Sequence, residues 1–137
     1  MESNNASFQQ LLRFFLSSNY PKDPTELLPN ATNTIAHCIS FGGNLAKVLK
    51  PADDEFIKGL IPAGVNYVWV DGSDEGKEGN WTWNNPMETI LLDYWGPNRP
   101  DNFGSGQDCM IYRYFNGEYL WDDKECTDND YPFICDI

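Results

Sequence analysis

Hydrophobic and polar positions follow two different spacings along this chain, and the change comes about half-way. In the first half, apolar residues recur at helical spacing in two stretches. They predict one helix that starts near residue 30 and ends before Gly42-Gly43, and a second helix over 52–60. Short apolar runs over 13–16 and 45–49 predict two strands. The first half is therefore expected to contain two helices and two short strands.

In the second half the spacing changes to two, which is typical of strands. The predicted strands cover residues 67–70, 111–115, 118–121 and 131–134. Asn116-Gly117, between two of them, is the strongest short signal for a β-hairpin. The polar, glycine-rich stretch 71–80 is predicted to be a loop. Pro132 cannot donate to a strand ladder, so it indicates either an edge strand or the start of one. Trp81 and Trp83, two residues apart, are predicted to share one face and to pack in the core.

Composition narrows the class of protein. A chain of 137 residues with 41% hydrophobic residues is long enough for one buried core, so a single domain is expected over 1–137. The net charge of −12 argues against nucleic acid, which binds clustered Lys and Arg. No apolar run approaches the ~18 residues of a membrane span. The sequence gives no indication of the oligomeric state.

Four cysteines and a single histidine favour disulfides over a zinc site, because the zinc ligands would be too few. Three pairings are open, and a nested one would place a Cys109–Cys126 bridge inside a Cys38–Cys135 bridge. Disulfides indicate an oxidising compartment, so we expect a secreted protein. Because the apolar stretch 8–16 is not typical of a signal peptide, we expect Met1 to be an expression start or the leader to have been removed. The sequence also contains three glycosylation sequons, which begin at Asn5, Asn30 and Asn80.

Acidic and amide side chains gather on two segments, each next to a cysteine. They are Asp101, Asn102, Gln107 and Asp108 before Cys109, and Asp122 and Asp123 before Cys126. Hard oxygen ligands at this density favour Ca²⁺, which takes six to eight oxygens from carboxylates, amides and backbone. The sequence therefore predicts calcium as the cofactor.

Five segments, in order, resemble those of C-type lectin domains. They are HCISFGGNLAKV, YVWVDGSDEGKEGNWTW, WGPNRPDNFGSGQDC, YLWDDKEC and YPFIC. The resemblance runs from about Arg13 to the C-terminus, which leaves 1–12 as an N-terminal extension. It implies an α+β fold with two helices and a double-looped, mainly antiparallel sheet. It also implies the nested disulfides, Cys38–Cys135 and Cys109–Cys126.

The resemblance implies two calcium sites. An auxiliary site would use Asp74, Glu78, Asn102 and Asp108. A second site would use Asp101, Gln107, Asp122 and Asp123, but Arg99 stands where the family motif has Glu or Gln. A guanidinium cannot ligate a cation, and it adds a repulsion of about 4 kcal/mol per unit of ion charge at ~4 Å and an effective dielectric constant of ~20. Either the second site binds calcium weakly, or Arg99 replaces the ion by pairing with Asp122 or Asp123.

In sugar-binding members of the family, the second site also holds the sugar. The residues expected to contact a glycan are Arg99, Asp101, Phe103, Gln107 and Asp122. Pro100-Asp101, expected after a cis bond, resembles the galactose-type motif, and Phe103 would pack on the sugar or else anchor the loop. We expect a secreted, calcium-dependent lectin that prefers galactose. The alternative is a lectin-like domain that binds protein or another surface such as ice, and no enzyme motif is recognised.

Overall fold

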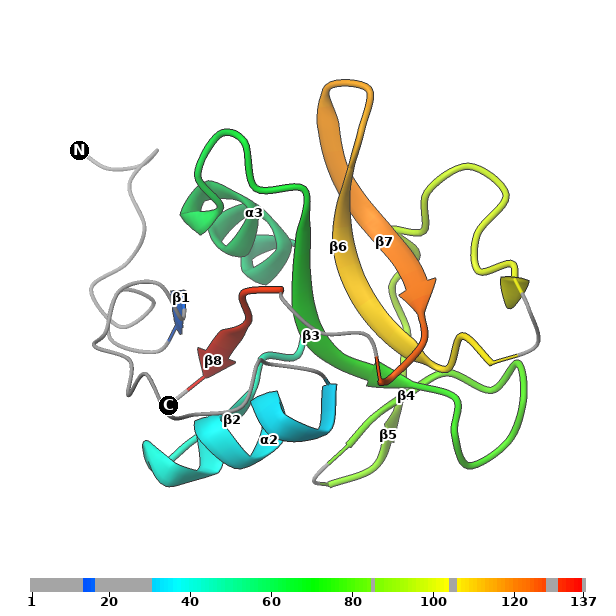
Figure 1. Cartoon of the computed structure of the whole chain (residues 1–137), viewed down its shortest axis with the longest axis horizontal. Coiled ribbons are helices and arrows are strands. Elements are labelled where there is room, and N and C mark those ends of the chain that lie inside the picture. Colours follow the sequence, from blue (N-terminus) through cyan, green and yellow to red (C-terminus); the bar gives the residue numbers. More distant parts are fainter. Residues whose placement is uncertain (1–13, 17–30, 85, 104–105, 128–130, 137) are drawn as a thin grey trace.

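The computed structural model describes residues 14–16, 31–84, 86–103, 106–127 and 131–136, and this part of the chain contains two helices and eight strands. In chain order they are β1 (Phe14–Leu16), α2 (Ala31–Ser40), β2 (Asn44–Leu45), α3 (Pro51–Leu60), β3 (Tyr67–Ser73), β4 (Thr82–Trp83), β5 (Glu88–Thr89), β6 (Cys109–Phe115), β7 (Glu118–Lys124) and β8 (Ile134–Asp136). The helices and β1 lie on one side of β3, and long loops lie on the other (Figure 1). Both predicted helices are present, within a residue or two of their expected bounds.

Two antiparallel sheets organise the fold and confirm the α+β class. The smaller sheet has the order β1-β8-β2, and the larger has the order β5-β4-β3-β6-β7. β8 is the central strand of the smaller sheet, so the edge interpretation of Pro132 is wrong. The strand predicted over 131–134 starts too early, because β8 begins at Ile134, two residues after Pro132. Among the residues described, no helix is both long enough and apolar enough to cross a membrane.

Two further predictions, one of a strand and one of a loop, need correction. The predicted strand over 45–49 ends at Leu45, because the next residue connects the two sheets. Ala46 N–H donates to Ile134 O of β8 (2.8 Å), and Ala46 O accepts Asp71 N–H of β3 (2.9 Å). Ala46 thus bonds to both sheets, and the strand β2 does not continue beyond Leu45. The predicted loop over 71–80 starts later, because β3 continues to Ser73, which pairs with both β4 and β6.

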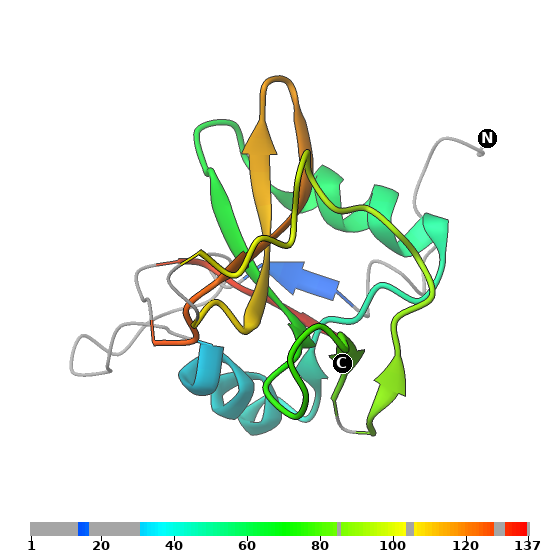
Figure 2. The ribbon, with the colours of Figure 1, turned by 90° about the vertical axis from the view of Figure 1, so that its right-hand side faces the viewer.

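Tryptophans dominate the core between the helices and the larger sheet. Trp81 and Trp83 are buried, as predicted, and Trp83 packs edge-on against Trp121, with ring centroids 5.8 Å apart. Figure 2 shows the β6–β7 hairpin extending upward beyond the rest of the ribbon. At the hairpin tip, Asn116 and Gly117 have φ values of 41° and 107°, the left-handed conformations that a tight hairpin turn requires.

The acidic first turn of α3 is buried. Asp53 and Asp54 suit the positive end of the helix dipole, but each also makes a specific contact. Asp53 Oδ2 accepts the Leu49 N–H (3.1 Å). Asp54 accepts the Tyr112 hydroxyl (2.6 Å) and pairs with Lys58 (3.0 Å). Asp54 therefore fastens α3 to the larger sheet and Asp53 fixes the chain that leads into α3, roles that the helix dipole alone does not predict.

Asp71 is a buried carboxylate that ties β3 to the residue after β4. Its Oδ2 accepts the Asn84 backbone N–H (2.7 Å), and Asn84 Nδ2 donates to the Asp71 carbonyl (2.9 Å). Burial raises the pKa of Asp71 to about 7, although hydrogen bonds from Asn84 and the charge of Lys47 act in the opposite direction. The buried charge therefore costs stability at neutral pH.

We expect Asp71→Asn to remove a pH dependence of stability. Because the pKa of Asp71 is raised from 3.8 to about 7 in the folded state, its contribution is fully present below 3.8 and is lost as the pH rises through about 7. Between pH 5 and pH 8 the wild type should lose about 2 to 3 kcal/mol relative to the variant. Urea unfolding at both pH values, in chelator, measures the difference. Glu118→Gln, at the exposed hairpin, should show the same change in the free energy of unfolding between the two pH values as the wild type. An equal change for the wild type and Asp71→Asn would contradict the prediction.

Candidate functional site

The segment 90–108, between β5 and β6, carries many of the predicted site residues. Its first part is fixed on β7, because Trp121 N–H donates to Tyr94 O (2.7 Å) and Gly96 N–H donates to Trp121 O (2.8 Å). The Trp95 indole packs edge-on against Trp121, with centroids 5.7 Å apart. Figure 2 shows this segment crossing in front of the β6–β7 hairpin. The polar part of the segment therefore starts from a fixed base.

Asp74, Glu78 and Asp108 form the first acidic cluster, with one carboxylate oxygen of each within 4.8 Å of the others. Asp74 directly follows β3 and Asp108 directly precedes β6, and Asp74 N–H donates to Asp108 O (3.1 Å). A turn closed by Gly79 N–H to Asp74 Oδ2 (2.8 Å) carries Glu78 back toward the strand ends. The structure thus brings together the three acids predicted for the auxiliary calcium site.

The first acidic cluster contains buried oxygens without a protein partner. Asp74 Oδ1 and Asp108 Oδ1 are shielded from solvent, and neither accepts a hydrogen bond. Burial is the main cause that raises the pKa of both Asp74 and Asp108. Asp74 raises the pKa of Asp108 further, whereas the Gly79 N–H acts in the opposite direction on Asp74. Within the described chain, no Lys or Arg side chain forms an ion pair with this cluster. Unpartnered carboxylate oxygens that converge in this way fit a calcium ion.

Asn102, the fourth predicted ligand of the auxiliary site, contacts its own loop. Its Oδ1 accepts the Gln107 N–H (3.0 Å), and Gln107 Oε1 accepts the Phe103 N–H (3.1 Å). An amide oxygen has two lone pairs, so this hydrogen bond leaves Asn102 able to ligate. The Phe103 ring is 75% exposed and does not anchor the loop.

Asp101, Asp122 and Asp123 form the second acidic cluster, again with oxygens within 4.8 Å of one another. Unlike the first cluster, it has a protein N–H on every carboxylate oxygen. Asp101 accepts from Phe103 N (3.2 Å) and Arg99 Nη1 (2.5 Å), Asp122 from Asp123 N (2.8 Å) and Arg113 Nη1 (2.9 Å), and Asp123 from Asp101 N (3.2 Å) and Asn102 N (2.6 Å). The predicted ligands are brought together, but protein donors already use their oxygens.

Arg99, the departure from the family motif, pairs with acids of the second acidic cluster. Its Nη1 binds Asp101 and lies 3.6 Å from Asp122 Oδ1. Of the two expected partners of Arg99, Asp122 lies within ion-pair distance, and no ion pair joins Arg99 to Asp123 in the described residues. Asp101, which was not an expected partner, lies closer to Arg99 than Asp122 does. The bond between Arg99 and Pro100 is cis, as predicted.

Arg113 on β6 is a member of this site that the sequence analysis missed. Its guanidinium donates to Asp122 Oδ2 at 2.9 Å. The hairpin register contains the signal, because Arg113 faces Leu120 and Ile111 faces Asp122. Arg113 and Asp122 are therefore diagonal neighbours on two paired strands, within reach of long side chains.

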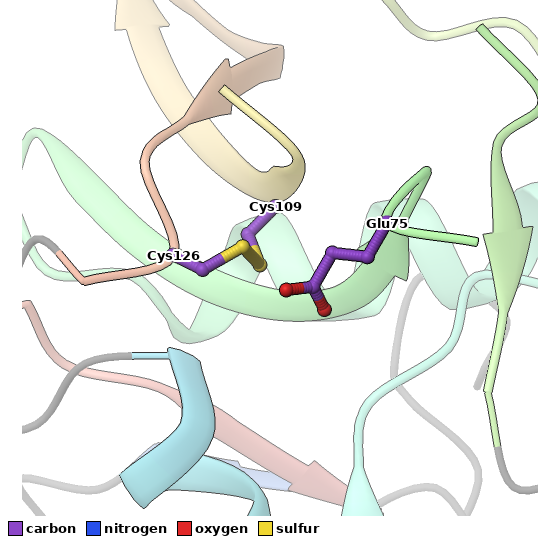
Figure 3. Close-up of side chains that lie close together, drawn as sticks. All are labelled: Glu75, Cys109 and Cys126. Atoms are coloured by element: carbon purple, nitrogen blue, oxygen red, sulfur yellow. A yellow bond between two sulfur atoms is a disulfide. The ribbon is translucent and has the colours of Figure 1, made fainter. Parts of the chain in front are cut away.

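A third group of potential ligands is Glu75 with Cys109 and Cys126. Figure 3 shows the Glu75 side chain pointing toward the two sulfur atoms. The cysteines form a disulfide, as do Cys38 and Cys135, so the structure has the nested pairing. A disulfide has no thiolate to offer a metal ion, and this group is not a metal site while the bridge is intact.

The sequence model of the lectin C-type domain family matches residues 30–137. This chain therefore belongs to the C-type lectin domain family. C-type lectin domains generally bind calcium. Perlucin of Haliotis laevigata is 32% identical over 103 residues, which are 73% of this chain and 64% of perlucin. Ladderlectin of Oncorhynchus mykiss is 31% identical over 101 residues, which are 70% of this chain and 50% of ladderlectin. The chain thus spans less than two thirds of the length of either relative.

The chain is also similar to two solved structures and to a further relative. SPL-1 in complex with GlcNAc has a TM-score of 0.70 and 28% identity, over 80% of this chain and 81% of SPL-1. The herring type II antifreeze protein has a TM-score of 0.73 and 22% identity, over 90% and 88% of the two chains. The type-2 ice-structuring protein of Brachyopsis segaliensis is 31% identical over 93 residues, which are 66% of this chain and 51% of that protein.

Proposed function

We propose that this chain is a secreted, calcium-dependent lectin that binds glycans with terminal galactose. Membership of the C-type lectin domain family and the likeness to a GlcNAc complex support glycan binding. The two disulfides support an extracellular location. Catalysis is not part of this proposal, because both pairs of cysteines are oxidised and His37 is stacked on Phe133.

The observation that supports calcium is the pair of buried, unpartnered oxygens in the first acidic cluster. Asp74, Glu78 and Asp108 would hold the ion, and Asn102 would add an amide oxygen. The ion would supply positive charge where three carboxylates converge. The protein itself also connects the two segments that carry these ligands. The Asp74 N–H donates to Asp108 O and so joins the end of β3 to the end of the 90–108 segment.

The observation that carries the sugar proposal is the exposed Phe103 side chain, whose own backbone N–H donates to Asp101. An aromatic face binds the apolar face of a pyranose, and galactose presents such a face when its hydroxyl groups bind a neighbouring acid. Asp101 and Arg99 are both partly exposed, at 35% and 24% of their side chains. A sugar stacked on Phe103 would therefore meet both hydrogen-bond acceptors and donors.

We expect Phe103→Ala to weaken galactose binding by about tenfold, because an aromatic contact contributes about 1 kcal/mol beyond its buried area, and the lost area adds to this. Titration with galactose and with mannose, in calcium and in chelator, measures the affinity and the preference. Leu91→Ala is the matched control, since Leu91 is an equally exposed apolar side chain (89%) on the same segment. Equal affinity of Phe103→Ala and wild type for galactose would overturn the sugar site.

A second candidate function is the binding of another surface without sugar recognition. The Arg99 guanidinium already engages the acids that sugar hydroxyl groups would need. Similarity to a type-2 ice-structuring protein supports this candidate. Absence of binding on a glycan array, together with inhibition of ice recrystallisation or retention of a protein ligand, would favour this candidate.

A further inference from the structure

The residues of the second acidic cluster do not fit a calcium ion. A calcium ion takes six to eight oxygen ligands, and it competes with every hydrogen-bond donor that already uses them. Each of the six oxygens of Asp101, Asp122 and Asp123 already accepts an N–H from the protein. Backbone groups give four of these hydrogen bonds, so they belong to the fold of the loop and of β7. An ion could enter only by displacing these donors or by competing with them.

Two guanidinium groups already balance the charge of this cluster. Three carboxylates and two guanidinium groups leave one negative charge. That charge corresponds to Asp123, whose oxygens accept the N–H groups of Asp101 and Asn102. A divalent ion here would gain little attraction and would lie beside Arg99 and Arg113. The first cluster differs, since its three carboxylates have no cationic partner among the residues described.

The guanidinium of Arg113 is held in place from two sides. It lies over the ring of Phe115 at 4.9 Å from the centroid and near the ring of Tyr67 at 5.8 Å. These cation–π contacts and the Asp122 hydrogen bond fix a side chain that would otherwise rotate freely. The hydrogen bond to Asp122 also raises the pKa of Arg113. Asp122 thus has a permanent cation on one oxygen.

We propose that Arg99 and Arg113 replace the second ion, so that the domain binds one calcium ion and contacts its ligand through the Arg99–Asp101 pair. Ligand contact through the Arg99–Asp101 pair rests on the proposed function. The ligand class is a neutral sugar with two adjacent hydroxyl groups, one accepting from Arg99 and one donating to Asp101. Calcium in the first cluster then acts on sugar binding only by holding the loop, and it makes no contact with the sugar.

Calorimetric titration with calcium counts the ions directly. The wild type should bind one ion, and Glu78→Gln should abolish or strongly weaken that binding. Arg99→Gln removes a cation and adds an oxygen, so it should take up a second ion. Lys50→Gln is the matched control, because it removes an exposed positive charge before α3 and should keep one ion. Two ions in the wild type, or a single ion in Arg99→Gln, would overturn the proposal.

A thermal unfolding measurement in chelator tests the same pairing without calcium. Arg99→Gln leaves Asp101 and the buried Asp122 with less positive charge, so its melting temperature should fall by about 5 °C. Lys50→Gln should have the same melting temperature as the wild type, and an equal melting temperature of Arg99→Gln and wild type would refute the role of Arg99.

The proposed function and the replacement of the ion by arginine fail separately. One bound calcium ion and no bound glycan would reject only the proposed function. Two bound calcium ions with bound galactose would reject only the replacement by arginine.

Discussion

In excess chelator, the melting temperature of this domain is expected to fall by about 10 °C. A ligand that binds only the native state adds about 2.7 kcal/mol at a hundredfold excess over its Kd, and this corresponds to about 10 °C for a chain of this length. The physical reason is the first acidic cluster, in which Asp74 and Asp108 each hold a buried oxygen without a partner. Without an ion, the like charges of three converging carboxylates are uncompensated.

Glu78→Gln and Glu75→Gln make a matched pair for this experiment. Both residues are exposed and lie in the same turn, but only Glu78 belongs to the first acidic cluster. Differential scanning calorimetry with and without calcium should show a small calcium effect for Glu78→Gln and the full effect for Glu75→Gln. A wild-type melting temperature that does not change in chelator would exclude a stabilising calcium ion.

The helices and the hairpin were predictable because their signals are local in the sequence. Gly42, with φ of 85°, follows α2, and Asn116-Gly117 turns the β6–β7 hairpin. Such signals require no knowledge of distant residues. The strand over 45–49 was predicted from apolar content alone, and it failed because Ala46 bonds to two different sheets, which a local pattern does not show.

The candidate site was predictable in its acids and less so in its partners. The resemblance identified Asp101, Asp122 and Asp123 as one group, and the structure brings them together. Both donors to Asp123 come from tertiary structure, since the backbone N–H groups of Asp101 and Asn102 reach it across 22 and 21 residues of sequence. Arg99 stood out because it departs from the family motif. Arg113 did not, because its pairing with Asp122 depends on the register of two strands.

Phe103 shows a different limit of sequence analysis. As an aromatic residue in a polar loop, it fitted both a buried anchor and an exposed contact. The conformation of the loop backbone determines which of these two roles the ring has. Hydrogen bonds from Gln107 N–H to Asn102 and from Phe103 N–H to Gln107 close the loop without using the ring. The ring is left facing solvent.

Loss of the Cys38–Cys135 disulfide is expected to lower the free energy of unfolding by about 4 to 5 kcal/mol. In the chain-entropy model, a bridge that closes a loop of 97 residues contributes about 4.7 kcal/mol, compared with about 3 kcal/mol for the 17-residue loop of Cys109–Cys126. The position of the bridge adds to this difference, because both Cys38 and Cys135 are fully buried and join α2 to β8, the central strand of the smaller sheet.

The double variant Cys38→Ala/Cys135→Ala tests this expectation against Cys109→Ala/Cys126→Ala as its matched counterpart. Urea unfolding in calcium should place the first variant well below the second, and many of its molecules should be unfolded at 37 °C. The second variant should remain folded at 25 °C, because it keeps the longer bridge. Equal stability of the two variants would contradict the entropic argument. Mass mapping of the wild type that found crossed pairs or free thiols would reject the nested pairing on which the prediction depends.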